Sequence, residues 1–125
     1  MSTSEIATVL AWHDALTGHD LDTLLNLSSD DVELATPTGA SQGIAALREW
    51  AERFRGTVSP GRMFVHHGVV VVEEELSGAE QEQRQAVATA FRVVHDQVTS
   101  VFRHDSLAEA LADTGLLASD EVTDG

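Results

Sequence analysis

The stretch Ser28–Trp50, SSDDVELATPTGASQGIAALREW, contains the local signals that decide the fold. A polar turn at Ser28–Asp31 is followed by an alternating strand over Val32–Thr36 and a corner at Pro37–Gly39. An amphipathic helix then begins at about Ile44. Proline lacks an amide hydrogen and glycine tolerates backbone conformations that other residues avoid, so the strand is expected to end at this corner. The stretch therefore predicts a strand, a corner and a helix in that order.

Helical spacing dominates before this stretch, and strand-like alternation dominates after it. Apolar residues predict a helix from about Ile6 to Leu16, ended by Gly18, and a short second helix capped by Asp20. The helix of the opening stretch is expected to reach Phe54. Further strands are expected at 62–67, 69–76, 85–95 and 98–104, with a short closing helix over about 107–116. Helices followed by an antiparallel sheet predict the α+β class.

The length and composition indicate one soluble domain. The 125 residues suffice for one core, and we expect a domain over 1–117 with a disordered acidic tail over 118–125. The chain has no cysteine, which excludes disulfides and thiolate catalysis. No apolar run approaches the roughly 20 residues that a membrane-spanning helix needs. The N-terminal residues lack a basic segment ahead of an apolar one, so a cytoplasmic location is expected.

The charge balance is strongly acidic, with 21 acidic residues against 7 basic ones and a net charge of −14. Such a field repels phosphate backbones and anionic lipids, so neither nucleic acid nor a membrane is expected as a partner. Much of the excess lies in Glu73–Glu75, in Glu80–Glu82 and in the tail. We interpret all three as solvated surface and not as cation sites.

The order of elements, together with the segment HDLDTLLNLSSDDVELATPTG at His19–Gly39, resembles the NTF2-like superfamily. This superfamily has an α+β cone fold and includes ketosteroid isomerases, SnoaL-type polyketide cyclases and limonene epoxide hydrolases. The resemblance covers roughly Ile6–Leu116 and is most specific over Gly18–Trp50. It implies N-terminal helices packed in a strongly curved antiparallel sheet, with a small-molecule pocket between the helices and the sheet.

The resemblance to ketosteroid isomerase places three of that enzyme's catalytic groups on unsuitable residues. The general-base aspartate falls on Thr36, the oxyanion-hole tyrosine on Trp12 and the protonated aspartic acid on Thr89. A threonine hydroxyl is no base at neutral pH, and an indole N–H is a weak donor, so isomerase activity is not expected. The chain also has no tyrosine, which argues against the tyrosine-assisted chemistry of limonene epoxide hydrolases.

The strongest candidates for chemistry lie in the last expected strand. Alternation places Val101, Arg103 and Asp105 on one face, and the family register turns that face towards the cavity. SnoaL-type cyclases carry an acid near the end of this strand, and Asp105 falls on it, so Asp105 and Arg103 are the catalytic candidates. The plainer alternative, which we favour, is that Asp105 caps the closing helix with Arg103 as its surface partner.

The expected pocket wall combines aromatic, histidine and hydroxyl side chains. Adjacent His66 and His67 point to opposite faces of a strand, so either one can face the pocket but both cannot bind one ion. His13 is interpreted as a hydrogen-bonded core histidine. No metal and no cofactor are predicted. The residues assigned to the pocket are Trp12, Thr36, Trp50, Phe54, His66, Thr89, Phe91 and Val101.

Apolar residues on the outer face of the sheet predict a homodimer. Ala88, Ala90 and Val94, with Phe102 nearby, would form an exposed patch on a monomer, and such patches mark interfaces. Relatives in the superfamily pair through the sheet in a similar way.

Three interpretations of function follow. The first is a binding module that holds a small lipophilic molecule in the cone pocket without transforming it. The second is a SnoaL-like enzyme of cyclase, isomerase or hydratase type, with Asp105, Arg103 and a histidine in acid–base roles. The third is an interaction protein whose pocket is filled by side chains.

Overall fold

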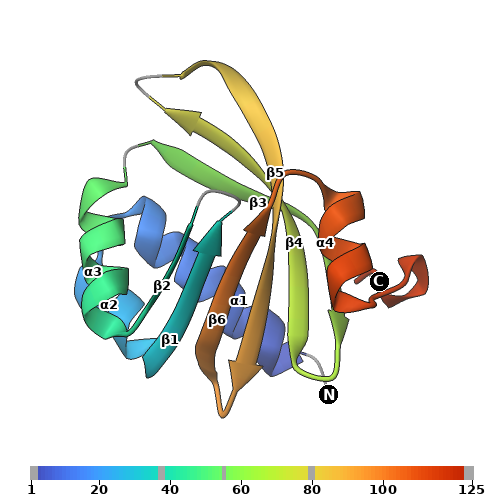
Figure 1. The fold of residues 1–125 in the computed structure, drawn as a ribbon, viewed down its shortest axis with the longest axis horizontal. Helices are drawn as coiled ribbons and strands as arrows, with labels where there is room; N and C mark the ends of the chain where they lie inside the picture. The colour runs from blue at the N-terminus through green and yellow to red at the C-terminus, as the bar shows by residue number, and fades with distance from the viewer. Residues whose placement is uncertain (1–2, 37–38, 55, 79–80, 123–125) are drawn as a thin grey trace.

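In the described residues, six strands form one curved sheet with helices on both faces (Figure 1). The computed structural model of the chain describes residues 3–36, 39–54, 56–78 and 81–122. Within these ranges, no helix is long and apolar enough to cross a membrane. The elements in chain order are α1 (Thr3–Thr17), α2 (Leu21–Asn26), β1 (Ser28–Thr36), β2 (Gly39–Gln42), α3 (Ile44–Arg53), β3 (Thr57–His66), β4 (Val69–Gly78), β5 (Gln81–Val94), β6 (Gln97–His104), α4 (Leu107–Thr114) and the 3₁₀ turn η1 (Ala118–Asp120). The α+β class predicted from the sequence is confirmed.

The sheet is mixed, and not wholly antiparallel as expected. Its strand order is β2-β1-β6-β5-β4-β3, and β1 runs parallel to β6 while the other neighbours are antiparallel. Parallel neighbours need a long connection, which α3 and the β3–β5 meander supply here. The pairing sets Leu34 of β1 beside Val101 of β6. This junction brings the opening stretch of the sequence against the last strand.

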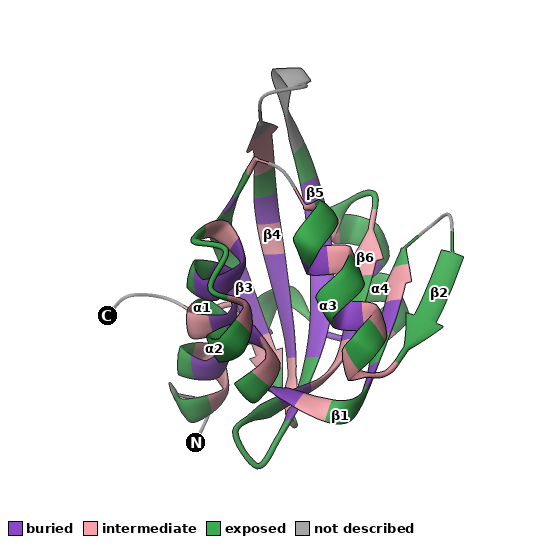
Figure 2. Cartoon of the chain, turned by 90° about the vertical axis from the view of Figure 1, so that its left-hand side faces the viewer, coloured by how far each residue is buried: buried purple, intermediate pink, exposed green. Residues whose placement is uncertain are grey.

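The two faces of the sheet have separate cores. Helices α1–α3 cover one face, which we call the inner face, and α4 covers the other, the outer face (Figures 1 and 2). Strand alternation sorts the side chains, so that Val70 and Val72 join the inner core while Val71 joins the outer one. The inner core includes Val9, Trp12, Leu16, Leu24, Leu47, Val70, Val72, Phe91 and Val98. The smaller outer core contains Phe64, Val71, Ala88, Ala90, Ala110 and Leu116.

Several boundaries differ from the sequence prediction. Strand β1 begins at Ser28, where a polar turn was expected, and β2 was not predicted. Strand β3 begins at Thr57, before the expected start at residue 62, and therefore includes Pro60. The β3–β4 register shifts between Pro60 and Met63, and a bulge on an edge strand is a place where a sheet tolerates proline. Positions 37–38, the centre of the expected corner, lie outside the described residues.

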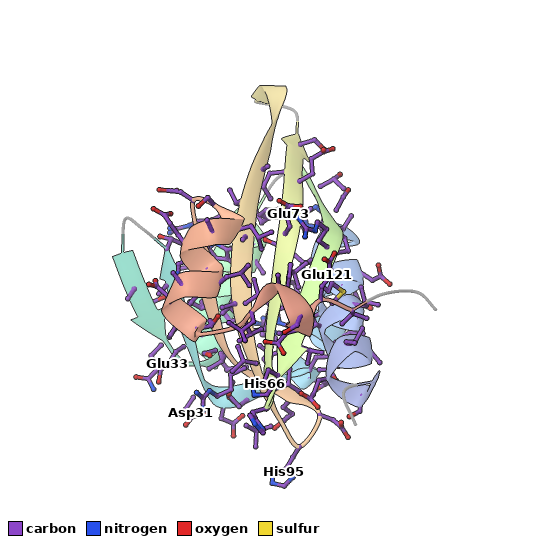
Figure 3. The ribbon with its side chains drawn as sticks, turned by 90° about the vertical axis from the view of Figure 1, so that its right-hand side faces the viewer. Asp31, Glu33, His66, Glu73, His95 and Glu121 are labelled. Carbon is purple, nitrogen blue, oxygen red and sulfur yellow. The ribbon has the colours of Figure 1, made fainter. Side chains whose placement is uncertain are left out.

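The acidic tail is ordered over part of its length, which corrects the prediction of disorder from residue 118. Residues 118–120 form η1, and Glu121 then forms a β-bridge with Phe64. The amide of Val122 donates to the carbonyl of Met63 at 2.7 Å, and the carboxylate of Glu121 accepts two hydrogen bonds of 3.0 Å from Arg62. These contacts hold the tail against β3 (Figure 3). Residues 123–125 lie outside the described residues.

Candidate functional site

A recess opens between α3 and the strands β1, β2 and β6, at the edge of the inner face. Its volume is about 180 Å³. Apolar and small residues form most of the wall, with Trp50 contributed by α3 and Arg103 by β6. The lining residues are Leu34, Ala35, Thr36, Gly39, Ala40, Ser41, Trp50, Val101 and Arg103. Arg103 is the one charged side chain among them.

The sheet register explains how this wall is assembled. Val101 lies between Leu34 of β1 and Phe91 of β5, and Arg103 lies opposite Thr89 of β5. Directly paired residues in a sheet share a face, so the row of Leu34, Val101 and Phe91 is apolar, and the next row brings Arg103 beside Thr89. The inner face thus changes from apolar to polar between Val101 and Arg103, two successive inward positions of β6.

A buried polar cluster of His13, Glu74 and Thr89 lies in the inner core. His13 of α1 donates through Nδ1 to the carbonyl of Val9 at 2.8 Å, and its Nε2 contacts Oε2 of Glu74 on β4. The hydroxyl of Thr89 donates to Oε1 of Glu74 at 2.6 Å. His13 and Thr89 are 1% exposed and Glu74 is 3% exposed. Because Nδ1 faces a carbonyl, which only accepts, Nδ1 is the donor in that bond, and Nε2 is the nitrogen that faces the Glu74 carboxyl group.

The hydrogen bonds within this cluster satisfy both nitrogens of His13 and both oxygens of Glu74. Such complete pairing is what permits ionisable groups to be buried. Aromatic rings also lie between the cluster and the recess. The Trp50 ring is stacked on Trp12 with centroids 6.1 Å apart, and the Phe91 ring contacts Trp12 at 5.3 Å and His13 at 5.2 Å. The cluster has acid–base groups, but in this arrangement it stabilises the interior.

Glu74 is not part of a solvated run at Glu73–Glu75, as the sequence had suggested. Glu74 is buried, whereas Glu73 is half-buried and Glu75 exposed. The available signal was the period of two along β4, because Glu74 continues the inward positions of Val70 and Val72. The interpretation of His13 as a hydrogen-bonded core histidine is confirmed.

The residues assigned to the pocket wall do not all gather at the recess. Thr36, Trp50 and Val101 line it. Trp12, Thr89 and Phe91 are buried deeper in the inner core, and the indole of Trp12 donates to the hydroxyl of Ser28 at 3.1 Å. Phe54 follows the end of α3, half-buried, with its ring 5.7 Å from that of Trp50.

The expectation that His66 or His67 faces the pocket is wrong. Met63 and Val65 of β3 point to the inner core, so Phe64 and His66 point outward. His66 is exposed, with Nδ1 3.7 Å from a carboxylate oxygen of Asp120, and Figure 3 shows it on the side of the sheet that carries α4. His67 is exposed in the β3–β4 turn with φ of 48°.

Asp105 and Arg103 do not form the expected pair. Strand β6 ends at His104, so the alternation does not extend to Asp105, which is exposed. Asp105 lines a second groove, between β6 and α4, that Arg103 also borders. Among the described residues there is no ion pair between them. The hydroxyl of Ser106, and not Asp105, caps α4 by accepting the amide hydrogen bond of Glu109 at 3.2 Å.

The outer face is less exposed than the sequence suggested. Ala88 and Ala90 are covered by α4, where they pack with Ala110. Val94 remains 44% exposed and Phe102 37% exposed. The predicted apolar patch is therefore reduced to its last two members.

Two side chains with shifted pKa values, Arg62 and Glu121, lie at the edge of β3, away from the recess. Hydrogen bonding from Arg62 lowers the pKa of Glu121 below its ordinary value, and the same contact raises the pKa of Arg62. No three histidine, aspartate or glutamate side chains of the described ranges lie close enough to hold a metal ion.

The fold and the position of the recess define the chain as an α+β cone of the NTF2-like class. A family model, the SnoaL-like domain, matches residues 9–101, well over half of the sequence. The chain therefore belongs to the SnoaL-like domain family. A search of curated proteins finds no match.

Solved structures with the same fold are distant in sequence. An NTF2-like protein of unknown function from Cytophaga hutchinsonii aligns with a TM-score of 0.74 at 13% identity, covering 86% of this chain and 94% of that one. An LEH-like epoxide hydrolase from M. tuberculosis aligns with a TM-score of 0.72 at 19% identity, covering 88% of each. An NTF2-like protein from Burkholderia xenovorans aligns with a TM-score of 0.68 at 22% identity, covering 87% and 95%. At these identities the likeness concerns the fold alone.

Proposed function

We propose that the protein binds a small, mostly apolar molecule in the recess at the mouth of the cone. The observation that carries this proposal is the composition of the wall, in which Leu34, Ala35, Trp50 and Val101 surround few polar groups. Ligand sites are typically concave and apolar, with a small number of polar groups that orient the ligand.

The aromatic packing of the interior limits the size of this ligand. Trp12, Trp50 and Phe91 fill the space behind the recess, whose volume of about 180 Å³ lies below the roughly 300 Å³ at which drug-sized sites begin. The ligand is expected to be a single ring or a short hydrocarbon resting on Trp50, without contact to His13 or Glu74.

The enzymatic alternative has less support in this geometry. No carboxylate or imidazole is found among the described residues that line the recess, and Asp105 faces the neighbouring groove. A reaction that uses Asp105 would need a substrate reaching past Arg103 into that groove. If a substrate were identified, unchanged turnover by Asp105→Asn would remove Asp105 from the mechanism.

Homodimer formation through the outer face is retained as part of the proposal. Val94 and Phe102 lie exposed on neighbouring strands β5 and β6, beside the region that α4 covers. A second chain can remove these two side chains from water, although the area is smaller than the sequence analysis assumed. The interaction-protein alternative draws on the same surface and on the filled interior.

Native mass spectrometry of the freshly purified protein tests the ligand and the dimer together. We expect a mass of two chains plus a small-molecule increment. The increment should disappear in Ala40→Trp, which places an indole at the recess, and persist in Ala45→Trp, which changes an exposed alanine of α3 outside the lining. An increment that survives Ala40→Trp, or a wild-type chain without one, would count against binding in the recess. A single-chain mass would contradict the dimer.

A further inference from the structure

We infer that the ligand of the recess is a carboxylic acid, bound as its anion by Arg103, with its apolar body on Trp50. This inference rests on the proposed function and adds the chemical class of the ligand. It would make the protein a binder of small aromatic or hydrocarbon monocarboxylates.

Among the described arginines, only Arg103 combines partial burial with the lack of a partner in the described residues. Of the arginines whose side chains the structure describes, Arg103 is the one that is partly buried, while Arg48, Arg53, Arg62 and Arg92 are exposed. Arg53 and Arg62 pair with Glu49 and Glu121, but Arg103 has no hydrogen-bond or ion-pair partner among the described residues. A partly buried, unpaired guanidinium is costly in a folded protein. A bound anion would supply the missing partner.

The polar groups of the neighbouring described residues bond to one another and not to Arg103. Thr89 lies opposite Arg103 in the sheet, but its hydroxyl donates to Glu74. Glu74 is in turn occupied by His13. The buried cluster thus satisfies its own members and leaves the guanidinium of Arg103 available to the recess.

The shape of the Arg103 guanidinium and the charge around it determine which anion fits the recess. The planar guanidinium presents parallel N–H donors that match a carboxylate in a bidentate manner. A phosphate carries more charge, and the described lining contains no second cation to balance it. Asp105, Glu109 and Asp113, which line the adjoining groove, and the net charge of −14 further disfavour a multiply charged ligand. A monocarboxylate satisfies Arg103 with the least repulsion.

Paired probes of one shape test this inference. We would titrate ¹⁵N-labelled protein at neutral pH with benzoate and with neutral benzamide, following the indole N–H signals. The chain has two tryptophans, and Trp50 lines the recess while the indole N–H of Trp12 is bonded to Ser28. The Trp50 signal should move most, and the acid should bind roughly tenfold or more tightly than the amide, because it gains charge-assisted hydrogen bonds.

The matched variants are Arg103→Gln and Arg53→Gln. Arg103→Gln should abolish the preference for the acid over the amide, whereas Arg53→Gln, on the exposed side of α3, should leave that preference as in the wild type. The Trp12 signal reports whether the core of each variant is intact. Equal affinity for acid and amide, or a preference that survives Arg103→Gln, would overturn the inference but leave the proposed function standing. If neither probe moved the Trp50 signal, the proposed function itself would be contradicted.

Discussion

The inner and outer faces of the sheet each contain a basic side chain paired with a glutamate, in opposite environments. On the inner face, His13 and Glu74 meet in nearly complete exclusion of water. On the outer side, Arg62 pairs with Glu121 on partly exposed side chains. Coulomb attraction grows as water is removed, but so does the penalty for leaving one partner alone. The location of a pair, more than its chemistry, sets how strongly the fold depends on it.

The two faces of the sheet also differ in the size of the side chains that pack on them. The inner face uses the large rings of Trp12 and Phe91, whereas the outer face brings α4 close to the sheet through Ala88, Ala90 and Ala110. Rings contribute large buried areas, and small residues permit close approach with little tolerance for added volume. The inner face should therefore be sensitive to lost partners and the outer face to enlarged side chains.

The largest expected effect follows from removing one partner of the inner pair. Glu74→Leu leaves His13 buried without its carboxylate and should lower the free energy of unfolding by about 3–5 kcal/mol, measured by urea denaturation. Glu33→Leu, at an exposed glutamate of β1, is the control and should change stability by less than about 0.5 kcal/mol.

A double variant separates the lost pair from the changed volume. His13→Leu combined with Glu74→Leu should be clearly less destabilising than the sum of the two single changes, because no unpaired ionisable group then remains. Strictly additive losses would show that the two residues do not act as a pair, and the contrast between the faces would fail.

The second effect concerns the outer face. Ala110 of α4 is fully buried against the sheet, so Ala110→Leu should overpack this interface and destabilise the protein by about 1–3 kcal/mol in thermal or urea unfolding. Ala108 is exposed on the same helix, and Ala108→Leu should be nearly neutral. Equal effects of the two changes would indicate that α4 does not pack against the sheet in solution.

The smallest effect is expected at the exposed pair. The pKa of Glu121 is lowered from 4.5 by hydrogen bonding from Arg62, so the folded state releases the proton of Glu121 more readily than the unfolded state does. The contribution to stability is therefore full above pH 4.5 and is lost as the pH falls through the lowered pKa. Wild type and Arg62→Gln should differ slightly in urea midpoint at pH 7, and the difference should shrink in acid and in high salt. A difference that grows on acidification would contradict this assignment.

How well a feature could be predicted from the sequence depended on how far apart in the chain its interacting residues lie. The period of two in β6 correctly indicated that Val101 and Arg103 share a face, and the order of helices before strands indicated the class. The boundaries failed where a tertiary contact extends an element, as at Ser28, where β1 begins, and at Glu121, which bridges to β3. Asp105 was misplaced because its position depends on where β6 ends, which periodicity does not specify.

By itself, the sequence determined the α+β class, the resemblance to the cone family and the shared face of Val101 and Arg103, because these depend on neighbours a few residues apart. The tertiary structure decided which elements and side chains pack against each face of the sheet. It paired β1 in parallel with β6, laid α4 over Ala88 and Ala90, and joined His13 to Glu74 across a separation of 61 residues. Periodicity states that a side chain points inward, but its partner is chosen by the packing of elements that are distant in the chain.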